Sequence, residues 1–320
     1  MSWISDHAVD RLREAAESPD LSGTRYRLGE RIGRGGMGVV FLAEDQTLGR
    51  RVALKVLDLP DAAGDFAARL LREACVLARL EHPGIVPVHD AGTLPDGRVF
   101  YAMKYVEGSR LDEHARQLDS LPGRLRLFQR ICEAVAFAHS RGVLHRDLKP
   151  ENVMVGPFGE VLVMDWGVAK VLAEPADLQG VDSRRAPVAS ATASGAIVGT
   201  AGYMSPEQAR GESATLDQRT DVYALGKLLE FLLCAGKETP AAPLAAAIAK
   251  ATRDDRAGRY ASASDLAADV GRYLDGLPLE AYPDNLLRRV GRLLRRHQVV
   301  VWLVVAYVFM RVVLILLLGR

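Results

Sequence analysis

The stretch VLHRDLKPENVMV, Val143 to Val155, places a charged cluster between two apolar runs. Within eight residues it carries six polar or ionisable side chains, namely His145, Arg146, Asp147, Lys149, Glu151 and Asn152. A loop that only connects two strands is rich in Gly, Ser and Pro and has no need of so many charges. Charges held between hydrophobic segments are either exposed caps or parts of a site. Residues elsewhere in the chain decide between these two interpretations.

The bulk composition describes an ordinary folded protein of 320 residues. This length accommodates one large two-lobed domain and an appendage. The formal net charge is +1, so no global field points to nucleic acid, and none is expected as a partner. Cys75, Cys132 and Cys234 are far apart and fit no zinc spacing, so we expect buried, reduced thiols.

The C-terminal segment 299–318, VVVWLVVAYVFMRVVLILLL, is long enough to cross a bilayer as a helix. Arg311 within it costs about 2.5–3.5 kcal/mol on the insertion scale, whereas each of the fifteen Leu, Ile, Val and Phe residues returns about 0.3–0.6 kcal/mol. Insertion is therefore favoured, and the segment is predicted to be a single transmembrane helix. A buried core helix with a charged cap is the alternative.

The segment before it, 281–298, combines apolar residues at helical spacing with five arginines on the other face. Such a basic amphipathic helix is typical of the surface of an anionic leaflet. The positive-inside rule then places everything N-terminal to it in the cytoplasm, at the cell (inner) membrane. Residues 1–25 are amphipathic, lack the pattern of a secretory signal, and are predicted to form an N-terminal helical extension.

Between these ends the pattern changes from strands to helices. Alternating apolar residues predict three strands between Tyr26 and Leu57, a helix over 66–80, and two more strands before Val106. After Gly108, helices are predicted over 121–141, 221–236, 244–254 and 262–276, with short strands around VMVG and EVLVMDWG. The fold class is therefore α+β, with an antiparallel N-terminal lobe at 26–106 and a mostly helical C-terminal lobe at 107–280.

The loop GRGGMG, Gly33 to Gly38, matches G-x-G-x-x-G. A dinucleotide-binding fingerprint needs a helix directly after it, but VVFLAED alternates as a strand does. A Walker loop needs Gly-Lys-Ser/Thr, which is absent. A glycine-rich flap between antiparallel strands fits, because glycines let the backbone approach a polyphosphate and donate N–H groups.

A lysine in VALK, Lys55, lies about twenty residues further on. Alone it is equally well explained as an edge residue whose stem is packed and whose amine is solvated. Its distance from the flap and the acidic Glu73 on the following helix suggest a Lys–Glu pair that holds phosphates.

Taken together, eight motifs resemble the eukaryotic-type (Hanks-type) serine/threonine protein kinases of bacteria, and they occur in that family's order. They cover most of the chain, from Tyr26 to Gly276, and read GRGGMGVV, VALK, the pair Arg72-Glu73, HPGIV, HRDLKPEN, MDWG, GTAGYMSPE and DVYALG. The resemblance implies a two-lobed kinase domain over 26–280 that transfers phosphate from ATP with Mg²⁺ to protein Ser/Thr hydroxyls. It also answers the opening question, because the charged stretch corresponds to the family's catalytic loop.

The resemblance implies a role for each matching residue. Asp147 would be the catalytic base, Lys149 would stabilise the moving phosphoryl group, and Thr200 would hydrogen-bond both. Asn152 and Asp165 would bind magnesium. The nucleotide would be held by residues of both lobes, namely Ile32, Gly33, Gly35, Gly36, Gly38, Val40, Ala53, Lys55, Glu73, Met103, Val106 and Met154.

Supporting residues follow from the same resemblance. His145 would be structural, and Arg146 would hold a phosphate on the loop 181–195, where Ser183, Ser190, Thr192 and Ser194 are candidates for autophosphorylation. Glu207 would pair with Arg259, and Asp221 would hydrogen-bond the backbone of the catalytic loop. A homodimer through the N-terminal lobe or the membrane helix is a further expectation.

Several positions depart from the family pattern. Trp166 replaces the usual Phe of Asp-Phe-Gly, and this bulkier ring biases the equilibrium between active and inactive states. Lys104 stands where a hinge Glu is common, and Ser205 replaces the first Ala of Ala-Pro-Glu. The segment between Leu232 and Arg259 is short, so a helix that supports peptide docking is predicted to be missing.

Two functions remain in competition. The first is an active, membrane-anchored serine/threonine kinase. The second is a pseudokinase that binds nucleotide or recruits partners. The short C-terminal lobe favours this second function. The presence of Lys55, Asp147, Asn152 and Asp165 favours the first. A small-molecule kinase lacks support because GTAGYMSPE resembles the form found in kinases that act on peptides.

Overall fold

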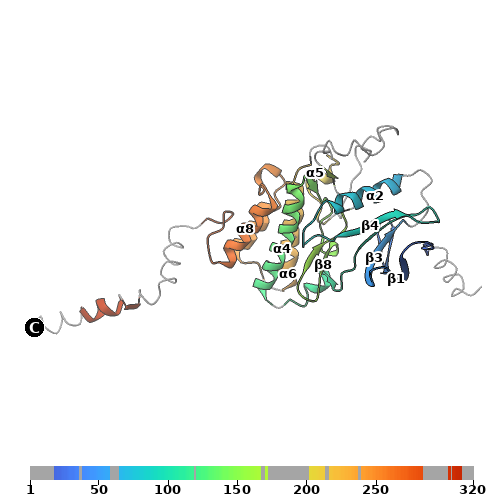
Figure 1. Cartoon of the computed structure of the whole chain (residues 1–320). Coiled ribbons are helices and arrows are strands. Elements are labelled where there is room, and N and C mark those ends of the chain that lie inside the picture. The colour runs from blue at the N-terminus through green and yellow to red at the C-terminus, as the bar shows by residue number, and fades with distance from the viewer. Residues whose placement is uncertain are drawn as a thin grey trace, which may run out of the picture.

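A computed structural model describes residues 18–35, 38–57, 65–118, 120–166, 170–171, 202–212, 216–236, 239–283, 302–303 and 305–311. Figure 1 shows a sheet with one helix, α2, on one side of the molecule and the helices α4, α6 and α8 on the other. The predicted two-lobed α+β architecture is therefore confirmed.

The N-terminal lobe is built on a five-stranded antiparallel sheet with the order β1-β2-β3-β5-β4. Its strands are β1 (Tyr26–Gly35), β2 (Gly38–Asp45), β3 (Arg50–Val56), β4 (Val88–Thr93) and β5 (Val99–Lys104). The predicted strands are found, although β4 begins at Val88, three residues later than its apolar run. Pro87 precedes this start, and proline cannot donate a ladder hydrogen bond.

Helix α2 (Asp65–Ala78) packs against the sheet through residues spaced as one helical face. Leu70, Ala74 and Leu77 are buried on this face, at intervals of four and three residues. Cys75 lies on the exposed side. The same helix carries Glu73 inward, so packing of the apolar face fixes where this carboxylate points.

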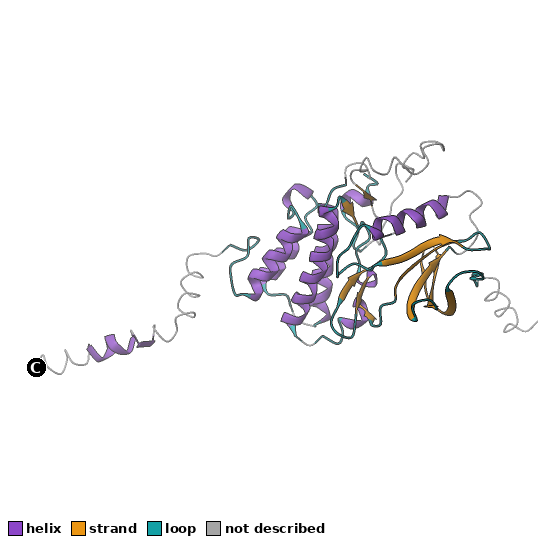
Figure 2. Cartoon of the chain, in the orientation of Figure 1, coloured by secondary structure: helices purple, strands orange, loops and turns teal. Residues whose placement is uncertain are grey.

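The C-terminal lobe is mostly helical, as Figure 2 shows in purple. Its α-helices are α3 (Leu111–His114), α4 (Leu121–Ser140), α5 (Pro206–Ala209), α6 (Arg219–Ala235), α7 (Ala242–Ala251) and α8 (Ala263–Leu274). Short strands complete it, namely β6 (Ser109–Arg110), β7 (Val143–Leu144), β8 (Val153–Val155), β9 (Val161–Val163) and β10 (Lys170–Val171), with the 3₁₀ turns η1 (Pro150–Asn152) and η4 (Arg256–Gly258). Only residues 236–241 connect α6 to α7, in line with the predicted shortening.

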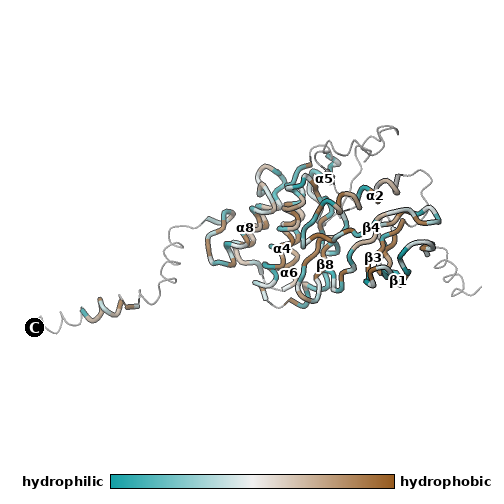
Figure 3. Tube along the Cα trace, viewed as in Figure 1, coloured by the Kyte–Doolittle hydropathy of each residue, from teal (hydrophilic) through white to brown (hydrophobic). Residues whose placement is uncertain are grey.

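Helix α4 forms the centre of this lobe and contacts both α6 and α8. Ser120 caps its start by accepting a hydrogen bond from the Gly123 N–H at 3.2 Å. Phe128, Ile131 and Val135 are fully buried along it. Figure 3 shows apolar segments along the inner helices and the strands of the sheet. One cluster of buried apolar residues includes members of both lobes, and a second, smaller cluster lies within the N-terminal lobe.

The three cysteines correct one prediction. Cys132 is buried inside α4, whereas Cys75 and Cys234 are exposed. None of the three is paired in a disulfide, and the expected burial is wrong for two of them. Both exposed cysteines lie on amphipathic helices, where residues next to an apolar stripe can face solvent.

The two ends of the chain are described only in part. Of the predicted N-terminal helical extension, residues 18–25 form turns rather than a helix, and residues 1–17 lie outside the described residues. Of the predicted membrane segment 299–318, residues 302–303 and 305–311 are helical and the others lie outside that set. Among the helices that are described, none is both long enough and apolar enough to cross a bilayer.

A buried carboxylate fastens the end of the C-terminal lobe. Asp269 on α8 accepts hydrogen bonds from the Tyr260 hydroxyl at 2.8 Å and from the backbone N–H groups of Glu280 at 2.6 Å and Ala281 at 3.0 Å. Lys250 adds an ion pair to Glu280 at 2.7 Å. The segment 277–283 is thereby strapped to α8, and we call this segment the C-terminal strap.

Replacing Asp269 by Ala should release the C-terminal strap, because three donors lose their acceptor in a buried site. We expect the free energy of unfolding to fall by about 3 kcal/mol in chemical denaturation. Proteolytic cleavage within 276–283 should also become faster. Asp275→Ala, which removes an exposed carboxylate one turn and a half further along, is the matched control and should change stability by less than about 0.5 kcal/mol.

Candidate functional site

A buried ion pair connects the sheet to α2. The Lys55 ammonium lies 2.9 Å from Glu73 Oε1 and 3.0 Å from Oε2, and the Tyr101 hydroxyl donates to the same carboxylate at 2.9 Å. Lys55 also reaches Asp165 Oδ1 at 3.2 Å. The predicted Lys–Glu pair is confirmed, and it extends to the aspartate that follows β9.

The opposite charges in this cluster stabilise each other, whereas burial and the nearby Asp165 carboxylate raise the pKa of Glu73. Burial disfavours the Lys55 ammonium, but Glu73 and Asp165 outweigh it and raise the pKa of Lys55 above its ordinary value. Burial likewise works against the Asp165 carboxylate, but Lys55 outweighs it and lowers the pKa of Asp165. Both groups are therefore charged at neutral pH, as a site that handles polyphosphate and a divalent cation requires.

The catalytic loop gathers the polar residues of the opening stretch. Lys149 Nζ lies 2.9 Å from Asp147 Oδ2. Asn152 Nδ2 donates to the Asp147 carbonyl at 2.8 Å and to Oδ2 at 3.3 Å. The backbone N–H of Met164, next to Asp165, donates to the Asn152 carbonyl at 2.8 Å. A continuous series of contacts thus runs from Lys55 through Asp165 to Asp147.

Asp221, at the start of α6, holds the backbone of this loop. It is fully buried, and it accepts from the N–H of His145 and the N–H of Arg146, both at 2.8 Å. His139 on α4 lies 2.7 Å from the same carboxylate. Burial raises the pKa of Asp221, but the His139 bond and the other partners outweigh it and lower the pKa. The role predicted for Asp221 in the loop geometry is confirmed.

Two residues of the site adopt left-handed backbone angles. Arg146 has φ +71° and Asp165 has φ +55°. Such angles cost a non-glycine residue about 1–3 kcal/mol and persist only where the surroundings fix them. Arg146 is fixed on both sides, by Asp221 at its N–H and by Gln208 Nε2 at its carbonyl at 2.7 Å.

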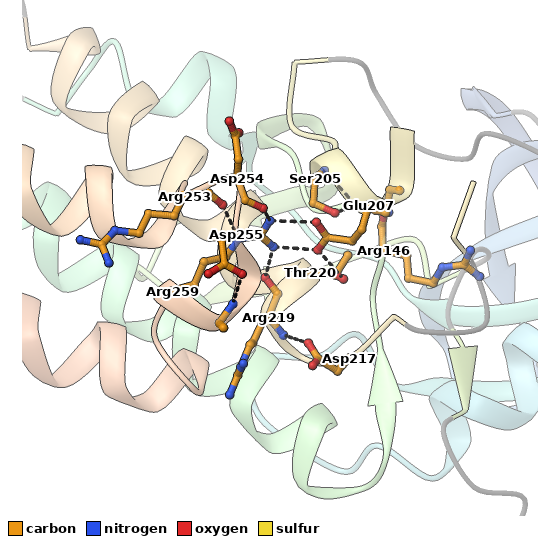
Figure 4. Close-up of polar contacts among 12 residues, drawn as sticks. Arg146, Ser205, Glu207, Asp217, Arg219, Thr220, Arg253, Asp254, Asp255 and Arg259 are labelled. Atoms are coloured by element: carbon orange, nitrogen blue, oxygen red, sulfur yellow. Dashed lines mark hydrogen bonds and ion pairs between the residues drawn. The ribbon is translucent and has the colours of Figure 1, made fainter. Parts of the chain in front are cut away.

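A second buried ion pair joins α5 to the residue that follows η4, as Figure 4 shows. Arg259 donates to Glu207 Oε1 at 2.7 Å and to Oε2 at 2.8 Å, in a two-pronged arrangement. Thr220 donates to Glu207 Oε1 at 3.1 Å. The predicted pair is confirmed, and through α5 it supports Gln208, the residue that holds Arg146.

The residues expected to line a nucleotide lie on adjoining strands. Cross-strand pairing aligns Gly33 with Val40, Val40 with Lys55, and Ala53 with Met103. Gly38 begins β2, where a Cβ would meet the Val56 carbonyl at 2.2 Å, so glycine is required there. The other lining residues are Ile32 and Gly35 on β1, Val106 after β5, and Met154 on β8.

A divalent cation fits the donors present. Asp165 is partly exposed and offers a carboxylate, while Asn152 donates through Nδ2, which leaves its amide oxygen available to a cation. Magnesium prefers hard oxygen ligands of this kind, completed by water and phosphate. Two predicted site residues, Gly36 and Thr200, lie outside the described residues, as do the four candidate phosphorylation positions.

Three residues of the site were not predicted. Tyr101 pairs with Lys55 across the sheet, and its two-residue spacing from Met103 was a usable signal. Gln208 donates to the Arg146 carbonyl from 62 residues further along the chain, and His139 contacts Asp221, which is 82 residues away. No local pattern indicates such contacts, because they depend on how whole helices pack.

Comparison with known proteins agrees with this geometry. A family model described as the protein kinase domain matches residues 26–256. The chain belongs to the protein kinase family. This kinase chain is 42% identical over 233 residues to the serine/threonine-protein kinase PknD of Chlamydia muridarum, a match that covers 65% of the chain and 24% of the relative. The resemblance drawn from the motifs is thus confirmed.

Other relatives give the same result. The serine/threonine-protein kinase PknD of Protochlamydia amoebophila is 36% identical over 298 residues, covering 78% of the kinase chain and 30% of the relative. The crystal structure of the PknI kinase domain of Mycobacterium tuberculosis matches with a TM-score of 0.58 and 26% identity, covering 80% of the kinase chain and 98% of that domain. The chain spans about a quarter to a third of the length of the curated relatives it matches.

The Glu207–Arg259 pair should make the free energy of unfolding depend on pH in the acidic range. Burial alone would raise the pKa of Glu207, but Arg259 outweighs it and lowers the pKa to about 2. Because the folded pKa lies below the ordinary value of about 4.3, the pair stabilises the fold above that value, and this stabilisation is lost as the pH falls towards 2. It amounts to about 3 kcal/mol.

Denaturant unfolding of wild type and Glu207→Gln between pH 7 and pH 2 tests this. The wild type should be more stable at pH 7, and the difference between the two proteins should shrink from about pH 5 downwards. A constant difference over this range would contradict the assignment.

Proposed function

We propose that the chain is an ATP-dependent serine/threonine protein kinase that transfers the γ-phosphoryl group of Mg-ATP to protein hydroxyls. The observation that carries this proposal is the continuous set of contacts from the Lys55–Glu73 pair through Asp165 and Asn152 to Asp147. Phosphoryl transfer depends mainly on positioning and charge neutralisation, which this arrangement of cation, carboxylates and amide supplies.

The N-terminal lobe would hold the nucleotide. Backbone N–H groups of the flap Gly33–Gly38 would face the phosphates, and Lys55, kept charged by Glu73, would neutralise part of their charge. Apolar residues of the sheet and the hinge, together with one residue on β8, would enclose the adenine ring, namely Ile32, Val40, Ala53, Met103, Val106 and Met154.

The catalytic loop would perform the transfer. Asp147 accepts the proton of the substrate hydroxyl, the hydroxyl oxygen forms a bond to the γ-phosphorus, and the bond from this phosphorus to the bridging oxygen breaks to release ADP. Lys149, 2.9 Å from Asp147, would stabilise the transferred group. Thr200 keeps the role implied by its motif. Bound magnesium, held by Asn152 and Asp165, would neutralise charge on the phosphates.

The proposal also assigns parts of the chain. Residues 26–280 form the kinase domain, 281–298 the basic segment at the membrane surface, and 299–318 the membrane helix. Exposed apolar side chains on the described helical residues support the last assignment: Trp302 and Leu303 are both 65% exposed and Phe309 is 70% exposed. So much exposed apolar surface on a helix is typical of an interaction with lipid or a partner.

Autophosphorylation with labelled ATP and Mg²⁺ tests the catalytic proposal. Replacing Asp147 by Ala should lower the rate about a hundred- to ten-thousand-fold, because a general base contributes this much. Mass spectrometry of the labelled wild type should find phosphate within 181–195. Asp275→Ala should retain the wild-type rate.

Measuring nucleotide binding beside phosphate transfer distinguishes an active kinase from a nucleotide-binding scaffold. If neither wild type nor Asp147→Ala incorporates label while both bind Mg-ATP, the chain is a nucleotide-binding scaffold. The short connection 236–241 would then explain why phosphate is not transferred. Equal labelling of the two proteins would exclude Asp147 as the base.

Deletion of residues 299–318 tests the membrane assignment. The full chain should stay in the membrane pellet after alkaline carbonate extraction, because a spanning helix is held by its apolar residues. The deleted chain should move to the supernatant and keep its rate of autophosphorylation. Full-length chain in the carbonate supernatant would contradict the assignment.

A further inference from the structure

Trp166 makes a contact that a phenylalanine cannot make. Its ring is 1% exposed, and its indole N–H donates to the carbonyl of Val163, three residues earlier, at 3.3 Å. Phenylalanine has no donor to offer this carbonyl. The bond closes a short loop, 163–166, that has Asp165 inside it.

Val163, whose carbonyl accepts the indole hydrogen bond, lies at the end of β9 and is held in place by other contacts. The N–H of Val163 donates to the Gly84 carbonyl at 2.8 Å, and Val163 forms a parallel bridge with Ile85. Residues 84 and 85 belong to the connection that follows α2. The indole therefore fastens the Asp165 loop to a strand that is tied to the segment following α2.

His145 forms a hydrogen bond with the next carbonyl of the same loop, that of Met164. The N–H of Asp147 donates to His145 Nδ1 at 3.3 Å, so Nε2 carries the ring proton and donates to the Met164 carbonyl at 2.9 Å. The rings of His145 and Trp166 lie against each other with centroids 4.6 Å apart. Two consecutive carbonyls just before Asp165 are thus held by two rings in mutual contact.

Asp165 needs such support. Its φ of +55° is an unusual angle for a non-glycine residue, and it directs the carboxylate towards Lys55 at 3.2 Å. A backbone in a sparsely populated region is kept there by its neighbours, and Trp166 and His145 are the side chains that fix the preceding peptide groups.

We propose that Trp166 is a positioning residue whose indole N–H latches Asp165 in its metal-binding orientation before metal and nucleotide arrive. The proposal rests on the proposed function, because it assigns Asp165 as the magnesium ligand. The latch acts only through Asp165, so it should affect binding that involves the metal and leave metal-free nucleotide binding unchanged.

Calorimetric titration of the full chain with a non-hydrolysable ATP analogue tests the latch. In Trp166→Phe, affinity for the analogue with Mg²⁺ should fall roughly 2- to 10-fold, which is the range for one neutral hydrogen bond. Affinity in the presence of a chelator should match the wild type. Trp302→Phe, which removes an exposed indole outside the site, is the control and should match the wild type in both titrations.

A change of one atom tests the N–H itself. The sequence has three tryptophans, so in the double variant Trp3→Phe, Trp302→Phe the residue Trp166 is the only one. Incorporation of 3-benzothienylalanine in a tryptophan auxotroph then replaces the indole N–H by sulfur and keeps the ring shape. The same selective loss of Mg²⁺-dependent affinity is expected, also where Trp166→Phe fails to fold.

The results that would overturn the latch differ from the result that would refute the proposed function. Unchanged Mg²⁺-dependent affinity in both substitutions overturns the latch, and so does an equal fall with and without Mg²⁺, which would indicate general packing. In the nucleotide-free single-tryptophan protein, the one indole N–H resonance should exchange slowly with solvent, and fast exchange overturns the latch too. Absence of phosphate transfer by the wild type, with a normal indole signal, would instead refute the proposed function.

Discussion

The buried carboxylate of Asp221 is the constraint on which the rest of the site depends. It holds two successive N–H groups of the catalytic loop and a histidine of α4, at distances between 2.7 and 2.8 Å. Hydrogen bonds to an ionised group are strong, and inside a protein they are poorly screened. The loop therefore has one backbone path, and Asp147 and Asn152 project from it in a fixed geometry.

The same principle recurs at each strained point of the site. Arg146 is held at its N–H from α6 and at its carbonyl from α5, while the peptide groups before Asp165 are held by two aromatic rings. The segment that carries Gln208 is in turn fixed by the buried Glu207–Arg259 pair. Left-handed angles at two charged residues are thus maintained by contacts from several separate elements, so the lobe must be folded before the site exists.

Much of this arrangement could be predicted from the sequence. Periodicity located the long helices and the sheet strands to within a few residues, and ordered motifs brought Lys55, Glu73 and Asp165 together although 110 residues separate the first from the last. Contacts of Gln208 and His139 were not predictable, because each depends on the packing of whole helices rather than on a local pattern. The contacts of Asp269 depend on how the segments on both sides of α8 fold back over it. Exposure of Cys75 and Cys234 was missed for a related reason, since a helix position next to an apolar stripe can face either way.

The C-terminal strap has a consequence for where the enzyme can work. Its last hydrogen bond to α8 is donated by the Ala281 N–H, and the proposed bilayer helix begins at residue 299. The 17 intervening residues, 282–298, cannot span more than about 60 Å even when fully extended. With this proposed helix in the bilayer, catalysis would be confined to a thin layer beside the membrane, in which substrates attached to the same membrane meet the domain at an effective concentration in the millimolar range. Selectivity could thus arise from shared location, with little demand on a peptide-docking surface.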